Sequence, residues 1–148
     1  MNKTRKKISI ISPCYNESHG IYKCHSAIKD LFSNKLNSYS YEHIFCDNSS
    51  SDDSKAILRK IAKEDKNAKI VFNASNYGSQ KSIFNTLKYA SGDAVILFLP
   101  IDLQDPPHLI DDFIKKWESG YDFVYGTRDK RSEFFIMKFI RKLFYSII

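Results

Sequence analysis

An even set of cysteines, internal repeats and long apolar runs are all missing from this 148-residue chain, and each absence argues against a class of protein. The three cysteines, Cys14, Cys24 and Cys46, are an odd set without a C-x-x-C pair, so we expect core thiols in a reducing cytoplasm rather than a disulfide scaffold. Neither they nor the four histidines show the spacing of a zinc site. The longest strongly apolar run, residues 94–101, is far shorter than the roughly 20 residues of a membrane span, and no signal peptide is recognised.

An excess of positive charge is also missing from the body of the chain, although the whole chain carries +6. Residues 2–7 and residues 128–148 each carry a net charge of +4, which leaves residues 8–127 at −2. Basic charge confined to the two ends fits contact with an anionic membrane surface at least as well as it fits a nucleic-acid groove. We therefore expect a membrane surface, and no nucleic acid, among the partners.

The chain does have an ordinary globular composition, with 43% hydrophobic and 27% charged residues, at a length typical of one domain. Short apolar, β-branched runs alternate with longer segments of helical period. This alternation predicts strands at 7–12, 41–46, 69–73, 94–99 and 122–125, joined by crossover helices. The predicted fold class is α/β, a three-layer sandwich with a central, mostly parallel sheet, in a single domain that spans residues 1–148.

Four helices are expected between these strands. The first covers about residues 20–32, and the second follows the SSSDD run. The third is expected to stop at Gly92 as a left-handed terminator, and the fourth to run from a cap at Asp105 to a stop at Gly120. The apolar residues expected to form the buried stripe of the third helix are Ile83, Phe84, Leu87 and Ala90.

Polar side chains follow each of the first four predicted strands. The runs are SPCYNE, DNSSSDDS, NASNYGSQK and PIDLQDPP. Because crossover connections bring these loops to one edge of a parallel sheet, we expect the ligand site at that edge. In the last run Asp102, Gln104 and Asp105 supply carboxylate and amide oxygens, which are the ligands that Mg²⁺ or Mn²⁺ prefers.

In this order and spacing, the chain resembles family 2 glycosyltransferases of the GT-A fold. The resemblance covers residues 7 to about 145 and is carried by ISIISPCYNE, FCDNSSSDDS, NYGSQKSIFNTLKYASGDAVILF, DLQDPPHLI and YDFVYGTR. DLQDPP is most similar to the polyprenyl-phosphate sugar transferases, of the dolichol-phosphate mannose synthase type. The resemblance implies an inverting transfer from a UDP-sugar or GDP-sugar to a lipid phosphate acceptor in cell-wall or polysaccharide biosynthesis.

The resemblance also implies which residues bind the nucleotide sugar. In that picture Pro13 and Tyr15 line the base, Glu17 lies beside the diphosphate, and Asp47 accepts hydrogen bonds from the base or ribose. The complete set is Pro13, Tyr15, Glu17, Asp47, Asn76, Gly78, Lys81 and Asp102. For Lys81, an ordinary surface lysine remains an alternative.

A divalent cation, Mg²⁺ or Mn²⁺, is the cofactor that the resemblance implies. Asp102 and Gln104 match its ligands, and the ion would stabilise the charge that develops on the leaving diphosphate. Asp102 and Arg128 are implied to be catalytic, since the guanidinium of Arg128 suits bidentate contact with phosphate. No protein general base is expected, because the oxygen of a lipid phosphate is already ionised near neutral pH.

Two motifs depart from the usual pattern of the family. Members usually read DDGS where this chain reads DNSS, so Asn48 replaces an acid and Ser49 replaces a glycine. Members read D-x-D before leucine and glutamine, whereas Pro100 stands here in place of the first aspartate. Two interpretations therefore stay open: an active transferase with a weakened metal site, or an impaired nucleotide-sugar-binding module that scaffolds a membrane transferase complex.

The carboxyl-terminal residues 132–148 predict a basic amphipathic helix. This helix either covers the sheet or lies in the headgroup plane, which implies a cytoplasmic protein that is peripheral at the inner face of the membrane. Similar transferases continue into transmembrane helices, so we expect a shortened chain or a partner membrane subunit as anchor, and a homo-oligomer is a further expectation. The residues of its apolar face are Ile136, Phe139, Ile140, Leu143, Phe144 and Ile147.

A receiver-like signalling domain has a similar size and topology. It requires an acid pair after the first strand and an acid after the third. The chain offers Asn16, Glu17 and Asn73 at these places, which disfavours a phosphoryl acceptor.

Overall fold

The computed structural model describes residues 5–97 and 101–127. The chain divides into two compact units, residues 1–114 and 115–148, and the boundary falls inside the helix Leu109–Glu118. In chain order the elements are β1 (Lys7–Cys14), α1 (Ser18–Asn34), β2 (Ser40–Asp47), α2 (Ser54–Glu64), β3 (Ala68–Phe72), α3 (Ser79–Leu87), β4 (Ala94–Leu97) and α4 (Leu109–Glu118). None of the helices in these described ranges is long and apolar enough to cross a bilayer.

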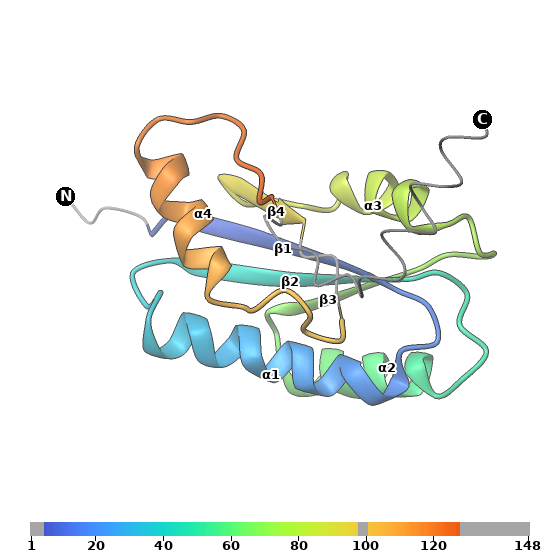
Figure 1. The fold of residues 1–148 in the computed structure, drawn as a ribbon. Helices are drawn as coiled ribbons and strands as arrows, with labels where there is room; N and C mark the ends of the chain where they lie inside the picture. Colours follow the sequence, from blue (N-terminus) through green and yellow to red (C-terminus); the bar gives the residue numbers. More distant parts are fainter. Residues whose placement is uncertain (1–4, 98–100, 128–148) are drawn as a thin grey trace, which may run out of the picture. The chain divides into compact units, whose positions relative to one another are not determined.

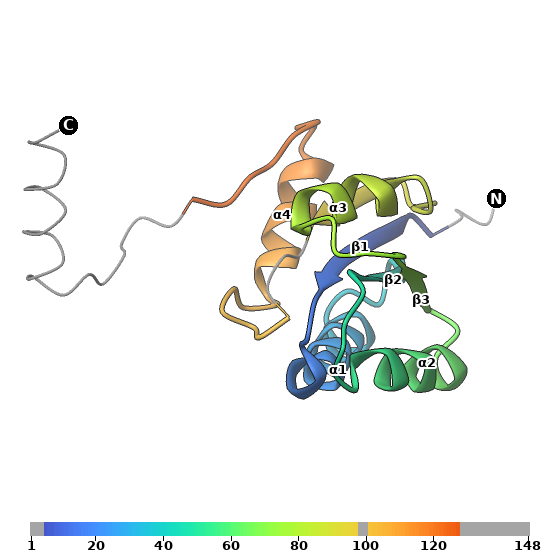
Figure 2. The same cartoon turned by 90° about the vertical axis from the view of Figure 1, so that its right-hand side faces the viewer.

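The first unit is built on a parallel sheet with the strand order β3-β2-β1-β4. Helices α1 and α2 cover one face of this sheet and α3 covers the other (Figures 1 and 2). The predicted α/β class with a parallel central sheet is therefore confirmed. Because the carboxyl ends of β1 and β2 lie in register, with Cys14 opposite Asp47, the loops that follow them meet at one edge.

The two central strands form the core because both of their faces are covered. The side chains of Ile8, Ile10, Ile11, Ile44 and Phe45 are completely buried. All three cysteines are free and buried, as the sequence predicts. Burial raises the pKa of Cys24 to about 12, so this thiol stays protonated and packs as a small apolar group.

A buried chain of polar groups runs through the α1 side of the sheet. Ser12 Oγ lies 3.0 Å from Nε2 of His43, whose Nδ1 lies 3.2 Å from Nδ1 of His25. Nε2 of His25 in turn lies 3.3 Å from Oδ2 of Asp65, which also pairs with Lys29 at 3.0 Å. With both rings neutral, Ser12 can donate to His43 and His43 to His25, and the N–H at Nε2 of His25 then lies near the carboxylate of Asp65 without a hydrogen bond to it.

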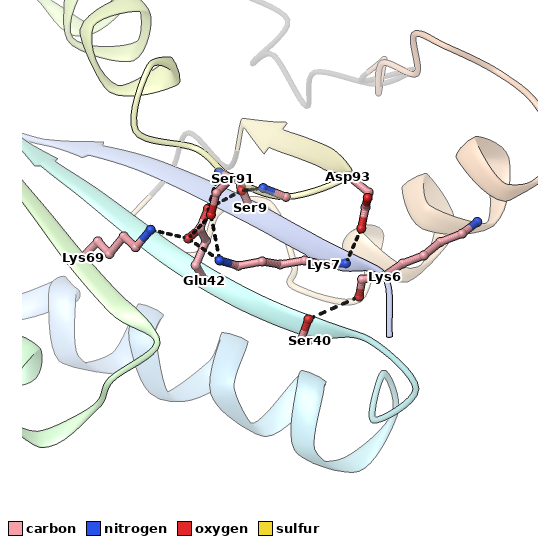
Figure 3. Close-up of polar contacts among 9 residues, drawn as sticks. Lys6, Lys7, Ser9, Ser40, Glu42, Lys69, Ser91 and Asp93 are labelled. Carbon is pink, nitrogen blue, oxygen red and sulfur yellow. Dashed lines mark hydrogen bonds and ion pairs between the residues drawn. The ribbon is translucent and has the colours of Figure 1, made fainter. Parts of the chain in front are cut away.

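A second buried cluster lies on the opposite face, around Glu42 of β2 (Figure 3). Its carboxylate is 2% exposed and accepts hydrogen bonds from Ser9 Oγ at 2.6 Å and from the backbone N–H of Ser91 at 2.7 Å. Lys7 and Lys69 complete the cluster with Nζ–carboxylate distances of 2.8 and 2.6 Å. The two lysines and the two hydrogen bonds compensate for the cost of burying the charge of Glu42. The cluster also connects β1, β2 and β3 to the segment before β4.

The buried side of α3 differs from the prediction. Its buried residues are Ser82 and Thr86, whereas Phe84, expected in the core, is 74% exposed. Small hydroxyl side chains face the sheet because they serve hydrogen bonds there: Ser82 accepts from Nδ2 of Asn73, and Thr86 donates to the carbonyl oxygen of Ser82. The apolar spacing of the sequence was therefore misleading for this helix.

The predicted role of Gly92 is also wrong. Helix α3 ends at Leu87, and Gly92 is not among the glycines with positive φ. A Cβ atom at Gly92 would lie 2.7 Å from the backbone oxygen of Lys7 and from the backbone nitrogen of Ser9. Glycine is required at this position because the chain passes directly against β1.

The entry to α4 lies later than predicted, at Leu109 rather than after Asp105. Two prolines follow Asp105, and a residue that precedes proline is disfavoured in helical conformation. Three successive i to i+3 hydrogen bonds, accepted by Pro106, Pro107 and His108, lead into the helix instead.

In the second unit, the described residues confirm Gly120 as the end of α4. Gly120 has φ 99°, its N–H donates to Trp117, and the N–H of Tyr121 donates to Lys116, which is the pattern of a Schellman cap. The strand predicted at 122–125 is absent: these described residues are irregular. A strand needs hydrogen bonds from a neighbouring strand, and within residues 115–127 there is none. The helix predicted at 132–148 lies outside the described residues.

Candidate functional site

The loops after β1 and β2 are joined into one platform by side-chain hydrogen bonds. Oδ1 of Asn16 accepts from the backbone N–H of Ser51 at 2.9 Å, and the N–H of Asn16 donates to Oγ of Ser50 at the same distance. The carboxylate of Asp52 accepts from the N–H groups of Ser18 and Ser54, the first residues of α1 and α2. Burial alone would raise the pKa of Asp52, but these hydrogen bonds lower it to about 2.

The predicted metal ligands Asp102 and Gln104 lie side by side. Oδ1 of Asp102 accepts from the backbone N–H of Gln104 at 3.2 Å, and Oδ2 accepts from its Nε2 at 2.6 Å. Both side chains are exposed. Leu103, between them, adopts φ 62°, a left-handed conformation that a branched side chain rarely takes. This turn brings the two oxygen-bearing side chains together.

The Asp102 turn packs against the beginning of α1. A Cβ atom at Gly20 would lie 2.9 Å from Cγ2 of Ile101 and 3.2 Å from its backbone oxygen, so the close approach requires glycine. Glu17, at the N-cap position of α1, lies within electrostatic reach of Asp102 and Asp52. Burial, followed by these two charges, raises the pKa of Glu17. A bound cation would reduce the repulsion of the charges of Asp102 and Asp52 on Glu17.

The donor set of this turn fits a hard cation in its chemistry, since it offers a carboxylate and an amide. Residues 5–97 and 101–127 hold no group of three or more His, Cys, Asp or Glu side chains that could bind a metal ion. Any cation held at Asp102 and Gln104 would therefore need ligand oxygens and water to complete its coordination. Pro100, which replaces the first aspartate of the metal motif, and Arg128, which the resemblance implies to be catalytic, lie outside the described residues.

The predicted base-binding residues differ in accessibility. Pro13 lies in β1 opposite Cys46, and Tyr15 directly after the strand is 46% exposed, so its ring is available for stacking. Asp47 is completely buried, and its Oδ2 accepts from the N–H of Ser50 at 3.2 Å. Its Oδ1 has no hydrogen-bond partner among the described residues. A buried carboxylate oxygen without a donor is unfavourable, which marks Asp47 as a place where a donor group is needed.

The remaining predicted residues lie at the start of α3. Gly78 precedes the helix with φ 83° and ψ 161°, a conformation accessible to glycine alone. Its N–H donates to Oδ1 of Asn76 at 3.0 Å, and Lys81 is exposed in the first turn of the helix. Asn76 also accepts from Nδ2 of Asn48, which follows β2. The structure therefore connects this loop to the loop after β2.

Backbone strain is concentrated at the same edge. The non-glycine residues with positive φ in the described ranges are Asn16, Ser49 and Leu103, one in each of the loops after β1, β2 and β4. Strained conformations of this kind persist where the surrounding structure fixes them, and they cluster at functional sites. The resemblance to a motif with glycine at position 49 agrees with the left-handed φ of 65° that Ser49 adopts.

Comparison with known proteins decides the family. The model of the family described as "Glycosyl transferase family 2" matches residues 9–141. The chain belongs to glycosyltransferase family 2. It is 36% identical over 141 residues to the glycosyltransferase YkcC of Bacillus subtilis, an alignment that covers 95% of this chain and 43% of that relative. It is 33% identical over 126 residues to the bactoprenol glucosyl transferase of Shigella phage SfV, covering 85% of this chain and 40% of the relative.

Solved glycosyltransferase structures share the fold. The mannosyltransferase PcManGT from Pyrobaculum calidifontis, in complex with GDP-Man and Mn²⁺, superposes with a TM-score of 0.63 at 20% identity, over 75% of this chain and 32% of that chain. TarS 1–349 of S. aureus, in complex with UDP-GlcNAc, gives a TM-score of 0.63 at 22% identity, over 87% and 38%. The GT-A fold is thereby confirmed. This family 2 chain spans less than half the length of either curated relative.

The sequence alone did not identify the residues that connect the loops. Asn48, Asn73 and Asp52 each hold contacts between segments more than 20 residues apart. Their one signal in the sequence is that each follows a strand in a run of polar residues. Such a run predicts a site but does not indicate which members bind a ligand and which bind one another.

Proposed function

We propose that this family 2 chain binds a nucleoside diphosphate sugar together with Mg²⁺ or Mn²⁺ and transfers the sugar to a polyprenyl phosphate at a membrane surface. The observation that carries the proposal is the Asp102–Gln104 turn, which presents adjacent carboxylate and amide groups, with Asp102 within electrostatic reach of Glu17. The relative named as a bactoprenol glucosyl transferase supports a lipid acceptor. The basic ends of the chain support contact with an anionic surface.

In this proposal the bound cation supplies a Lewis acid that stabilises the leaving diphosphate. Asp102 and Gln104 hold it, while Tyr15 offers an exposed ring for the base. Oδ1 of Asp47 accepts a hydrogen bond from the nucleoside, which would satisfy the oxygen that lacks a partner among the described residues. Glu17 lies close to the diphosphate, and Arg128 is assigned to phosphate contact by the resemblance alone.

Protection against thermal unfolding tests the donor site directly. A panel of UDP- and GDP-sugars, each with and without Mn²⁺, should raise the melting temperature of the wild-type chain in a cation-dependent way for at least one donor. The variant Asp102→Asn is expected to lose the cation-dependent part, because one anionic ligand is removed from a site with few protein ligands. Asp30→Asn, an exposed acid on α1, makes the matched control and should behave like the wild type.

The outcomes separate the alternatives. If no donor protects the protein with Mn²⁺, the transferase proposal is wrong. If Asp102→Asn keeps the whole cation-dependent shift, the ligand assignment is wrong. Donor binding without transfer of sugar to polyprenyl phosphate in anionic vesicles would identify the chain as a nucleotide-sugar-binding module.

A further inference from the structure

Asn48, directly after β2, holds the loop between β3 and α3 with three hydrogen bonds. Its Oδ1 accepts from Nδ2 of Asn73 at 3.2 Å and from the backbone N–H of Tyr77 at 2.9 Å. Its Nδ2 donates to Oδ1 of Asn76 at 2.7 Å. Asn48 is 4% exposed and Asn73 is 8% exposed, so the bond between them is buried, whereas the bonds to Asn76 and Tyr77 are part-buried. The side chain of Asn48 therefore connects the two loops from a buried position.

The bond to Asn76 fixes the start of α3. Oδ1 of Asn76 accepts from Nδ2 of Asn48 and, at 3.0 Å, from the backbone N–H of Gly78. The carbonyl oxygen of Gly78 then accepts from Oγ of Ser82, whose hydroxyl also accepts from Asn73. Because one amide oxygen receives two N–H groups, the orientation of the Asn76 amide is set by the donor that Asn48 provides.

In this chain the amide of Asn48 both accepts and donates in this arrangement. A carboxylate at position 48 could still accept from Tyr77, but it could not donate to Asn76. The amide of Asn76 would then turn its Nδ2 toward the carboxylate, and the N–H of Gly78 would lose its acceptor. The neutral amide also avoids a second negative charge beside the buried carboxylate of Asp47.

We propose that Asn48 is a positioning residue for the donor: it orients Asn76 and the start of α3, and so places Gly78 and Lys81 for the nucleotide sugar. The effect on donor binding rests on the proposed function. The effect on the loop does not, because it follows from the hydrogen bonds of the chain itself.

Amide hydrogen exchange of the free protein tests the loop. In Asn48→Asp the amide of Gly78 should exchange about fivefold to tenfold faster, as expected for one lost hydrogen bond, while that of Tyr77 keeps its protection. In Asn48→Ala both amides should exchange faster. The matched change Asn76→Asp retains an acceptor for both Asn48 and Gly78, so both amides should stay protected. Equal protection of Gly78 in the wild type and in Asn48→Asp would overturn the proposal.

Calorimetry with UDP and Mn²⁺ tests the consequence for the donor. Asn48→Ala should bind about tenfold more weakly than the wild type, because it removes the hydrogen bonds that hold Asn76 and Tyr77. Asn37→Ala, the same change at an exposed position, should match the wild type. Equal binding by Asn48→Ala and the wild type would overturn the positioning role in donor binding.

The two experiments separate this inference from the proposed function. If the wild type fails to bind any donor while Gly78 loses protection in Asn48→Asp, the proposed function fails and the loop assignment stands. If Asn48→Asp does not fold, Asn76→Ala takes its place, since it removes the acceptor of Gly78 and leaves the bonds of Asn48 to Asn73 and Tyr77. In that variant, unchanged exchange at Gly78 would contradict the assignment.

Discussion

At the scale of single residues, the candidate site is marked by left-handed backbone conformations. Leu103 adopts φ 62° and thereby brings Asp102 and Gln104 together. Ser49 adopts φ 65° in the loop that follows Asp47 and Asn48. An L-residue in this region is disfavoured by about 1–2 kcal/mol, so the surrounding hydrogen bonds must hold it there. The site edge of this chain thus stores strain that glycine would relieve.

Replacing Ser49 by glycine is expected to stabilise the protein. Ser49→Gly should raise the free energy of unfolding by about 0.5–1 kcal/mol, because relief of the left-handed strain exceeds the extra backbone entropy of glycine. Urea unfolding measures the change. The same substitution at Ser26, in the middle of α1, should lower the free energy by about 0.5 kcal/mol. Equal effects of the two variants would show that the φ of Ser49 is not strained.

At the scale of elements, packing decided which face of α3 is buried. The periodicity of the sequence assigns Ile83, Phe84 and Leu87 to the core, yet Ser82 and Thr86 face the sheet. Their hydroxyl groups are needed by Asn73 and by the backbone of the helix, and small side chains allow α3 to approach β1 and β2. A similar close approach explains why glycine is required at position 92, where the chain lies against β1 without room for a side chain.

Adding one methyl group at Gly92 should therefore separate the segment from β1. Gly92→Ala is expected to lower the free energy of unfolding by about 2 kcal/mol, since the clash involves backbone atoms that cannot rotate away. Gly120→Ala provides the control, because its Cβ would meet open space and only the strain at φ 99° remains, worth about 1 kcal/mol. The close approach would be disproved if Gly92→Ala were no more destabilising than Gly120→Ala.

At the scale of the whole molecule, buried titratable groups determine how stability depends on pH. Burial, with a contribution from His25, holds the pKa of His43 well below its usual range, and burial also lowers that of His25 despite Asp65. Both rings are therefore neutral in the folded protein, while the unfolded chain binds protons below about pH 6.5. Glu42 behaves oppositely: burial alone would raise its pKa, but Lys69, Lys7 and Ser9 hold it below its usual range.

We expect the free energy of unfolding to fall as the pH is lowered from about 7 to 5. In this range the histidines of the unfolded state bind protons, whereas the buried rings of the folded state stay neutral. The free energy of unfolding therefore changes by up to about 1.4 kcal/mol per pH unit for each ring. The contribution of Glu42 is complete above about pH 4.5 and is lost only below it, so the two effects occupy different windows. Urea unfolding between these pH values measures the slope.

His43→Gln tests the assignment. It should be less stable than the wild type near pH 7 but should show a flatter slope between pH 7 and 5, by up to one proton. His19→Gln removes an exposed ring and should leave the slope unchanged. A slope in His43→Gln that is as steep as that of the wild type would exclude His43 as a source of the acid sensitivity.

The sequence by itself determined the α/β class, the positions of β1 to β3, the burial of the cysteines and the proximity of Asp102 to Gln104, which is local. Each follows from periodicity or from residues two positions apart. Only the tertiary structure decided the buried face of α3, the absence of a strand at 122–125, the reason for Gly92, and the link from Asn48 to Asn76. These depend on partners distant in the chain, and a hydrogen bond or a steric contact is defined by both of its members. The local sequence around one residue does not identify its contact partner far away in the chain.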